Sequence, residues 1–525
     1  MKHVRQKGVH LSDDEMRGVT GAENAAFRSP VPTQVISNGE FNPPPQTQQQ
    51  RQVQELIARY ADTYGKKQGL DRRSFLKSAS GMAASFLAYN TVFGPVWMVS
   101  EAEAADKAMA NDRAKRLSGQ FVFDDQTHMV RDDFDKAGLL GLGEYAAKHW
   151  NPAMIDPAKG GVPMTLARYK MQNYLKEIFL DSDTKVALLS GAPFDDPAWW
   201  LMSNAQIAAA RNSINKIAGS RRMLGHFVFT PNYPNWMEEV ERGIKELKPD
   251  SWKGYTVGDP LSPTTKGTQW RLDDEKLLYP FYERISKTNI RTVCIHKGLL
   301  PADYEKSWKD IWQYNTVWDL EKAARDWPKI NFVIYHTALR PFTESPEAEL
   351  AEFEKTGYIQ WSTDICRMVR DKGLKNIYAE IGTSFANSCV SHPRFAAAFI
   401  GQLVNMMGVD RVVYGSDSVW YGSPQWQIEA LRRLEIPDDM MAKNKWKTKL
   451  GGADSAIKRK ILGENSARLY NYPLQTAFRA ITGDQIALMK DAYQKEGIGR
   501  NNAYYGYVPK LNAASTHPDD ATPTV

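Results

Sequence analysis

Four side chains of types that bind metal ions each come at the end of a short apolar run. Such runs are typical of buried strands; three lead to a histidine and the fourth leads through Gly-Ser to an aspartate. The four residues are His128, His296, His336 and Asp417. Three imidazoles and a carboxylate suit a borderline divalent cation such as Zn²⁺. One histidine after one strand is more often structural, but four such residues at equivalent places predict a single metal-centred site.

The elements that must position these residues alternate along the chain. Continuous apolar runs predict strands that are buried on both faces, and the stretches between them have the apolar spacing of amphipathic helices. This alternation predicts a parallel α/β fold, and the count of eight favours a closed (β/α)8 TIM barrel, which carries its chemistry at the carboxyl ends of the strands. The predicted strands are residues 121–128, 185–191, 223–229, 252–257, 291–296, 331–336, 376–382 and 411–417. The predicted helices include 162–180, a helix through Ile217 capped by Ser203 or Asn204, 238–247, 273–286, 316–327, 346–355 after a Ser345 cap, and 393–407.

Other polar and aromatic groups near the strand ends allow two interpretations each. Glu380, in the seventh predicted strand, either faces the barrel mouth or forms a buried pair with Arg or Lys. Trp420 and Tyr421, just after Asp417, either line a substrate site or pack beneath a loop. His226 lies inside the third apolar run, which predicts that it faces the core.

Composition narrows the class of partner. The 525 residues carry a net charge of only +6, and no run of Lys and Arg interleaved with aromatic residues suggests a nucleic-acid groove. We therefore expect a small-molecule substrate and no nucleic-acid partner. The three cysteines, Cys294, Cys366 and Cys389, give neither a disulfide framework nor a CxxC metal site.

The N-terminal part has the composition of an unstructured leader followed by an export signal. Residues 1–70 are rich in Pro and Gln and are predicted to be disordered, apart from a short helix around Arg51 to Tyr64. The next segment, 71–104, contains Arg72-Arg73 followed by Phe75-Leu76-Lys77, and then no charged residue between Ser78 and Ser100.

This segment resembles a twin-arginine signal peptide, which implies that the export machinery is a partner and that the protein is periplasmic or secreted. Ala102-Glu103-Ala104 has the small-x-small pattern of a cleavage site, so cleavage after Ala104 is expected. Retention as an uncleaved membrane anchor is the alternative.

The order of the ligand-type residues, taken with two motifs, resembles the amidohydrolase-related family of metal-dependent TIM-barrel enzymes, which includes aminocarboxymuconate semialdehyde decarboxylase. The motifs are Gly415-Ser416-Asp417 and the later Gly-x-Asn-Ser-Ala-Arg-Leu of residues 463–469. The resemblance covers about 121–472. It implies a barrel domain over 105–473, which leaves 474–525 as a helical extension and tail.

The resemblance also implies roles. His128, His296 and Asp417 would hold the metal, His336 would position the nucleophilic water or stabilise developing charge, and Asp417 would accept the proton of the water. The family's first histidine falls on Gln126 here, whose amide oxygen is a weaker ligand than imidazole. Three outcomes are open: Gln126 binds the metal, the site uses three protein ligands plus water, or the metal is lost.

The leading functional hypothesis is a hydrolase that uses a divalent metal, expected to be zinc, to activate water against a small ester, lactone or amide. A nonoxidative decarboxylase of the same fold is the alternative, and a metal-free, noncatalytic binding protein is the second alternative. The sequence leaves open whether the chain forms a homo-oligomer.

The export hypothesis predicts that replacing Arg72→Lys together with Arg73→Lys strands the protein in the cytoplasm, because the arginine pair is the specific part of the signal. Fractionation of cells that express the full chain measures this. The same exchange at Arg51 and Arg59, outside the motif, serves as control. Undiminished export of the Arg72/Arg73 variant would contradict the hypothesis.

Overall fold

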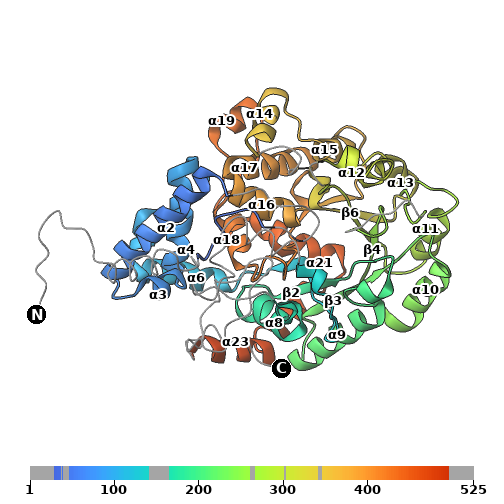
Figure 1. Ribbon diagram of the computed structural model, residues 1–525, viewed down its shortest axis with the longest axis horizontal. Helices are drawn as coiled ribbons and strands as arrows, with labels where there is room; N and C mark the ends of the chain where they lie inside the picture. Colours follow the sequence, from blue (N-terminus) through green and yellow to red (C-terminus); the bar gives the residue numbers. More distant parts are fainter. Residues whose placement is uncertain are drawn as a thin grey trace, which may run out of the picture.

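The computed structural model describes residues 29–36, 38, 46–140, 165–260, 267–300, 303–340 and 346–495. Its centre is a parallel eight-stranded sheet in which each strand pairs with the next one along the chain (Figure 1). The eight predicted strands and the (β/α)8 barrel are therefore confirmed. The strands are β1 (Phe123–His128), β2 (Val186–Ser190), β3 (Met223–Val228), β4 (Ser251–Tyr255), β5 (Thr292–His296), β6 (Asn331–Tyr335), β7 (Ile377–Glu380) and β8 (Val412–Val413).

The barrel closes between β1 and the loop that follows the very short β8. The Asp125 N–H donates to the Tyr414 carbonyl at 2.9 Å, and the Asp417 N–H donates to the Gln126 carbonyl at 2.9 Å. A further parallel bridge joins Thr127 to Ser418. These contacts fix the register of the last strand against the first, so the loop that carries Asp417 lies directly beside the end of β1.

Helices cover the outside of the barrel, and each predicted range overlaps with one, although the helix predicted over 273–286 begins only at Tyr279. Ser203 caps α9 through the Gln206 N–H, and the Gln206 side chain bonds back to Ser203 in a capping box. Helix α14 begins at Pro346, whereas Ser345 lies outside the described residues. The helices along the barrel are α8 (Met171–Leu175), α9 (Asn204–Ala218), α10 (Trp236–Arg242), α11 (Tyr279–Ser286), α12 (Tyr304–Ser307), α13 (Leu320–Asp326), α14 (Pro346–Thr356), α15 (Ser362–Arg370), α16 (Gly382–Ser391), α17 (Pro393–Gln402), α18 (Gln425–Arg433), α19 (Asp438–Lys443), α20 (Ala456–Arg459) and α21 (Asn465–Leu469).

Several of these helices, among them α12, α15, α16 and α18, fall in none of the predicted helical ranges. Helix α15 precedes β7, and α16 begins immediately after it, in sequence where the apolar run of β7 continues into small polar residues. The predicted helical extension at the C-terminal side is present as α22 (Leu474–Ile481) and α23 (Gln485–Lys495). The rest of the predicted tail, 496–525, lies outside the described residues.

The N-terminal part forms a helical layer against one side of the barrel, next to α16, α17 and α18 (Figure 1). Residues 48–67, within the range expected to be disordered, form helix α2, which Thr47 caps and which contains the predicted short helix. The layer consists of α2 (Gln48–Lys67), α3 (Arg72–Leu76), α4 (Ala79–Phe93), α5 (Glu101–Ala105) and α6 (Lys107–Ser118).

The segment expected to be an export signal is folded within this layer. Arg72 and Arg73 are exposed on α3, whereas Phe75 and Leu76 are buried. The uncharged stretch forms α4, which contacts α2, α5, α6 and α17. Ala104, at the expected cleavage site, is fully buried. Among the described helices, none combines the length and the apolar character needed to cross a membrane.

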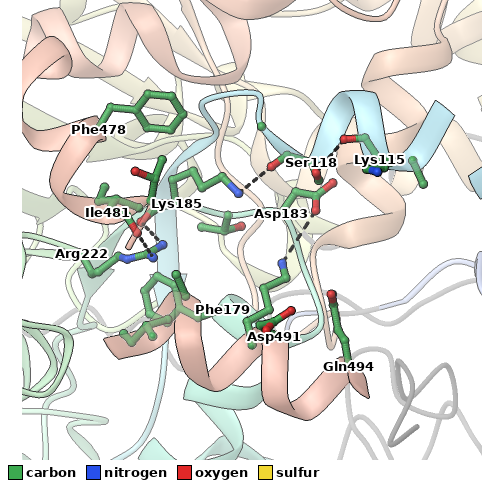
Figure 2. Close-up of a pocket in the computed structure, with 17 residues that line it drawn as sticks. Lys115, Ser118, Phe179, Asp183, Lys185, Arg222, Phe478, Ile481, Asp491 and Gln494 are labelled. Carbon is green, nitrogen blue, oxygen red and sulfur yellow. Dashed lines mark hydrogen bonds and ion pairs between the residues drawn. The ribbon is translucent and has the colours of Figure 1, made fainter. Parts of the chain in front are cut away.

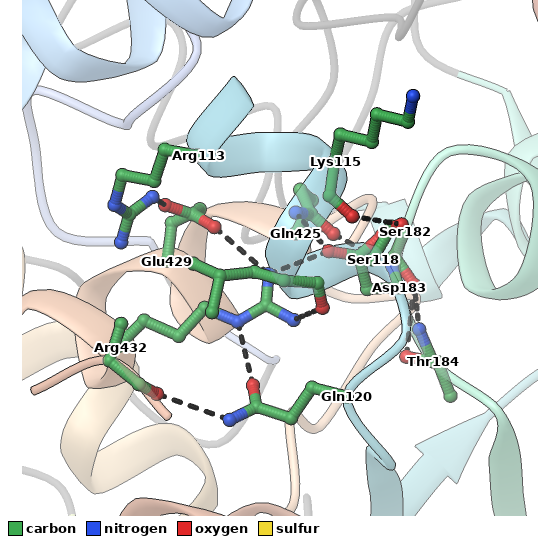
Figure 3. A network of polar contacts seen from close by, with 12 residues as sticks. Arg113, Lys115, Ser118, Gln120, Ser182, Asp183, Thr184, Gln425, Glu429 and Arg432 are labelled. Atoms are coloured by element: carbon green, nitrogen blue, oxygen red, sulfur yellow. Dashed lines mark hydrogen bonds and ion pairs between the residues drawn. The ribbon is translucent and has the colours of Figure 1, made fainter. Parts of the chain in front are cut away.

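A buried ionic network joins the layer to α18. The Arg433 guanidinium donates to both oxygens of Glu103 on α5, at 2.5 and 3.0 Å. Arg113 on α6 donates to Glu429 at 2.6 Å, and Arg432 contacts Glu429 at 2.9 Å (Figure 3). Burial alone would raise the pKa of Glu429, but the charges of the three arginines lower it well below its ordinary value.

Arg433→Met is expected to lower the free energy of unfolding by about 3–5 kcal/mol, because the buried Glu103 loses its bidentate pair and keeps the longer contact, of 3.8 Å, to Arg113. Urea unfolding of the full chain measures the change. Arg72→Met is the matched control, since the Arg72–Asp62 pair is half exposed and contributes about 0–1 kcal/mol.

The same network predicts a pH dependence. The contribution of Glu429 to stability is present above the ordinary pKa of a glutamate, about 4.3, and is lost as the pH falls through its lowered folded value.

The account of the network would be contradicted if, at neutral pH, Arg433→Met lowered the free energy of unfolding no more than Arg72→Met does.

Candidate active site

All five side chains predicted for the site lie together at the carboxyl ends of the strands. The Nε2 atom of His128 lies 3.1 Å from Oδ1 of Asp417. The amide nitrogen of Gln126 lies 3.4 Å from Nε2 of His128 and 3.5 Å from Nε2 of His336. His296 joins the group through His336, since their ring centroids are 4.8 Å apart, and the ring of Tyr255 stacks on His296. All five side chains are buried.

The spacing of these atoms fits a shared divalent cation. Two ligands with bonds of about 2.1 Å to a tetrahedral cation lie about 3.4 Å apart. The distance of 3.1 Å between His128 and Asp417 and that of 3.4 Å between Gln126 and His128 are close to that value. Oε1 of Gln126 is buried and has no hydrogen-bond partner among the described residues, so turning the amide over would point that oxygen at the imidazoles.

The donor set is nevertheless unusual. Within the described ranges, no three His, Cys, Asp or Glu side chains form a metal-binding group. His128 and Asp417 are in direct contact, and it is the amide of Gln126 that links them to His336. The residues fit a cation if the amide takes part, which is one of the three outcomes that the sequence left open.

The electrostatics keep Asp417 ionised. Burial alone would raise the pKa of Asp417, but the hydrogen bond and charge of His128, the charge of His336 and the Thr383 hydroxyl together lower it to about 2. The Thr383 hydroxyl donates to Oδ2 at 2.5 Å, and Tyr421 contacts Thr383 at 2.8 Å. At neutral pH the site therefore presents a carboxylate, which is the form that binds a cation or accepts a proton.

Two of the site residues are held in backbone conformations that L-residues rarely adopt. Asp417 has φ of 58°, and His336 has φ of 60° at the start of a run of three such residues. Each conformation costs on the order of 1–3 kcal/mol and persists only where the surroundings enforce it. Glu380 accepts the His336 N–H at 3.0 Å, and Ser384 donates to the His336 carbonyl at 2.7 Å. The turn is therefore fixed by β7 and α16.

Two further carboxyl groups, those of Asp124 and Glu380, support the backbone at the strand ends. Asp124 accepts both the N–H and the hydroxyl of Ser416, at 2.8 and 2.5 Å, and so fixes the loop that carries Asp417. Burial raises the pKa of Asp124 to about 7 and that of Glu380 to about 8, against the lowering effect of their hydrogen bonds. A β-carbon at residue 415 would collide with the Glu380 carboxyl group, so Gly415 is required for this approach.

The structure settles several alternatives and adds residues that the sequence did not indicate. Glu380 lies beneath His336 and accepts backbone N–H groups from His336 and Gly382. Trp420 lines the mouth, whereas Tyr421 is buried behind it. His226 faces the core and contacts Ser251 and Tyr335.

Sequence reasoning missed three residues of the site, Asp124, Thr383 and Asn38. Of these, only Asp124, an acid inside an apolar run, left a recognisable signal in the sequence.

Two cavities are candidates for the active site. A small one of about 40 Å³ lies at the barrel mouth, lined by Gln126, His128 and Asp417 and by the aromatic rings of Phe194, Tyr255 and Trp420. A larger one of about 480 Å³ lies at the opposite end, beside Lys185 and Arg222, which immediately precede β2 and β3 (Figure 2).

The larger cavity is an unpromising active site. Its cations are engaged: Lys185 donates to the Ser118 carbonyl at 2.7 Å, and Arg222 pairs with Asp484 at 2.6 Å. Barrel enzymes also carry their chemistry at the carboxyl ends of the strands. The mouth is therefore the candidate active site despite its smaller volume.

Comparison with solved structures finds matches at low sequence identity and low TM-score. A 5-carboxyvanillate decarboxylase from Sphingomonas paucimobilis is 14% identical, with a TM-score of 0.37 over 67% of this chain and 99% of that one. A putative 2-pyrone-4,6-dicarboxylic acid hydrolase from Pseudomonas putida is 12% identical, with a TM-score of 0.34 over 68% and 99%. A dihydroxybenzoic acid decarboxylase from a Polaromonas species, with bound manganese and an inhibitor, is 13% identical, with a TM-score of 0.35 over 67% and 97%. We assign no reaction to this chain on these similarities.

No curated protein sequence matches the chain. The amidohydrolase family model matches residues 191–472, from the end of β2 to just beyond α21, and so covers more than half of the chain. The matched residues carry His296, His336 and Asp417. The chain belongs to the amidohydrolase family.

Proposed function

We propose that the protein is a metal-dependent hydrolase that cleaves a small organic ester, lactone or amide with an activated water molecule. The observation that carries the proposal is the cluster of His128, Asp417 and Gln126 at the carboxyl end of an amidohydrolase-family barrel, with atom spacings that suit a common cation. The position of His336 and His296 beside this cluster supports it.

The residues that would hold the cation are His128, Asp417 and Gln126, with His296 as the further predicted ligand. A divalent ion such as zinc lowers the pKa of water toward about 7 and polarises a carbonyl group. An amide oxygen is a harder ligand than imidazole, so manganese is an alternative to zinc at this site.

Proton transfer and the stabilisation of developing charge are the roles of the side chains. Asp417, ionised at neutral pH, is placed to accept a proton from water through its Oδ1 edge and to return it to the leaving group. His336, whose backbone is fixed by Glu380 and Ser384, has its Nε2 atom 3.5 Å from the amide nitrogen of Gln126 and can hydrogen-bond to negative charge that develops beside it. The burial of all these groups strengthens their electrostatic interactions with a bound substrate.

A nonoxidative decarboxylase is the second candidate. The mouth cavity is lined by Phe194, Tyr255 and Trp420, and an aromatic lining suits a planar aromatic acid. The polar residues of the site would serve both reactions, so the reaction has to be assigned by the product. A metal-free binding protein is what would remain if the chain takes up no metal.

We also propose export by the twin-arginine route. The support is the Arg72-Arg73 motif and its exposure on α3. Phe75 and Leu76 of the same motif are buried, so recognition by the export machinery would require α3 to separate from α2 and α4, at least transiently.

The proposal is tested by screening the full chain against esters, lactones, amides and aromatic acids, with and without a chelator. Hydrolysis that is lost on chelation and restored by zinc or manganese supports the hydrolase, whereas metal-dependent release of carbon dioxide supports the decarboxylase. Activity that survives complete removal of metal would contradict both.

On any substrate found in this way, Asp417→Asn is expected to lower turnover by about 10²–10⁴-fold, because the proton acceptor is lost. Asp410→Asn is the control, since Asp410 is exposed and pairs with Lys460 at the surface. Steady-state kinetics and a thermal unfolding curve measure both variants. Wild-type turnover by Asp417→Asn would remove this residue from the mechanism.

A further inference from the structure

The segment that precedes the helical layer reaches into the barrel mouth. We call residues 29–36 and 38 the N-terminal arm. Its apolar side chains Val31, Val35 and Ile36 are almost fully buried. Backbone contacts hold it in place: the Ile36 N–H donates to Oδ1 of Asn387 on α16 at 3.1 Å, and the hydroxyl of Tyr89 on α4 donates to the Pro32 carbonyl at 2.5 Å. The arm is therefore packed as part of the fold.

Asn38 of the arm contacts Asp417 directly. Its amide nitrogen lies 2.9 Å from Oδ2 of Asp417 and 3.4 Å from the Thr383 hydroxyl, and its side chain lines the mouth cavity. Oδ2 of Asp417 thus receives two neutral donors, from Asn38 and from Thr383, while Oδ1 faces His128. This arrangement fixes the rotation of the carboxylate and leaves one oxygen to face the cluster.

Resting on the proposed function, we propose that Asn38 is a positioning residue for Asp417, so that the N-terminal arm is part of the active site. Groups that orient metal ligands in this way set the affinity of the site, because a ligand held in the binding geometry loses less freedom when the cation binds. Asn38 acts through Asp417 and takes no part in proton transfer.

Cleavage at the expected signal site would separate Asn38 from the barrel. Cleavage after Ala104 would remove the arm together with α2 to α5, and with them Asn38 and Glu103. It would also remove Glu103, the bidentate partner of the buried Arg433, and loss of one partner of a buried ion pair is unfavourable. The active protein therefore retains residues 29–104, whatever compartment it occupies.

The test is titration of the metal-depleted full chain with Zn²⁺ or Co²⁺, followed by calorimetry and by the optical spectrum of Co²⁺. Asn38→Leu keeps the volume of the side chain but removes the donor, and it is expected to weaken metal binding by about 10–100-fold. Asn38→Gln, which keeps an amide donor, is expected to bind more tightly than Asn38→Leu. Gln34→Leu, an amide replacement at a buried position of the same arm, is the matched control and is expected to bind like the wild type.

The outcomes separate the two proposals. A wild-type chain that binds neither metal overturns the proposed function and, with it, this inference. Metal binding by Asn38→Leu equal to that of the wild type overturns the inference alone, as does an equal weakening by Gln34→Leu. Mass spectrometry of natively produced, metal-loaded protein adds a second readout: an intact arm supports the inference, and a chain beginning at Ala105 overturns it.

Discussion

The register between β1 and the loop after β8 is the constraint on which the rest of the site depends. Because the Asp417 N–H donates to the Gln126 carbonyl, the last strand can place its carboxylate only beside the side chains of the first. That pairing brings His128 and Asp417 into contact across the seam of the barrel. A shift by one residue would turn alternate side chains to the other face of the sheet and would separate the two.

The contact between β1 and the loop after β8 is supported by groups that do not line the mouth cavity. Asp124 ties the Gly415-Ser416 turn to β1, and Glu380 holds the backbone of His336 in its left-handed conformation. Helix α16 contributes Thr383 to Asp417, Ser384 to His336 and Asn387 to the N-terminal arm. Asp417 and His336, the two site residues with rare backbone conformations, thus both receive these supporting hydrogen bonds. Such conformations persist where the surrounding structure enforces them, as expected at a site that is preorganised for a ligand.

Much of this architecture could be predicted from the sequence, because buried parallel strands leave continuous apolar runs and the ligand-type residues stand at their ends. The runs ending at His296 and His336 predicted β5 and β6 almost to the residue. The arm could not be predicted, because Asn38 and Asp417 are 379 residues apart in the sequence and the Pro-rich surroundings of Asn38 have the composition of a disordered leader. The uncharged stretch 78–100 was ambiguous for a different reason: a buried helix such as α4 and the core of an export signal share the same composition.

The central claim is that the cluster at the barrel mouth binds a catalytic cation. Its most direct test is a crystal structure of the full chain grown with zinc or manganese, with diffraction data collected at the absorption edge of the metal. The account predicts one anomalous peak about 2.0–2.2 Å from Nε2 of His128 and from the Asp417 carboxylate. A well-ordered mouth without such a peak, in crystals that contain the metal in solution, would contradict it.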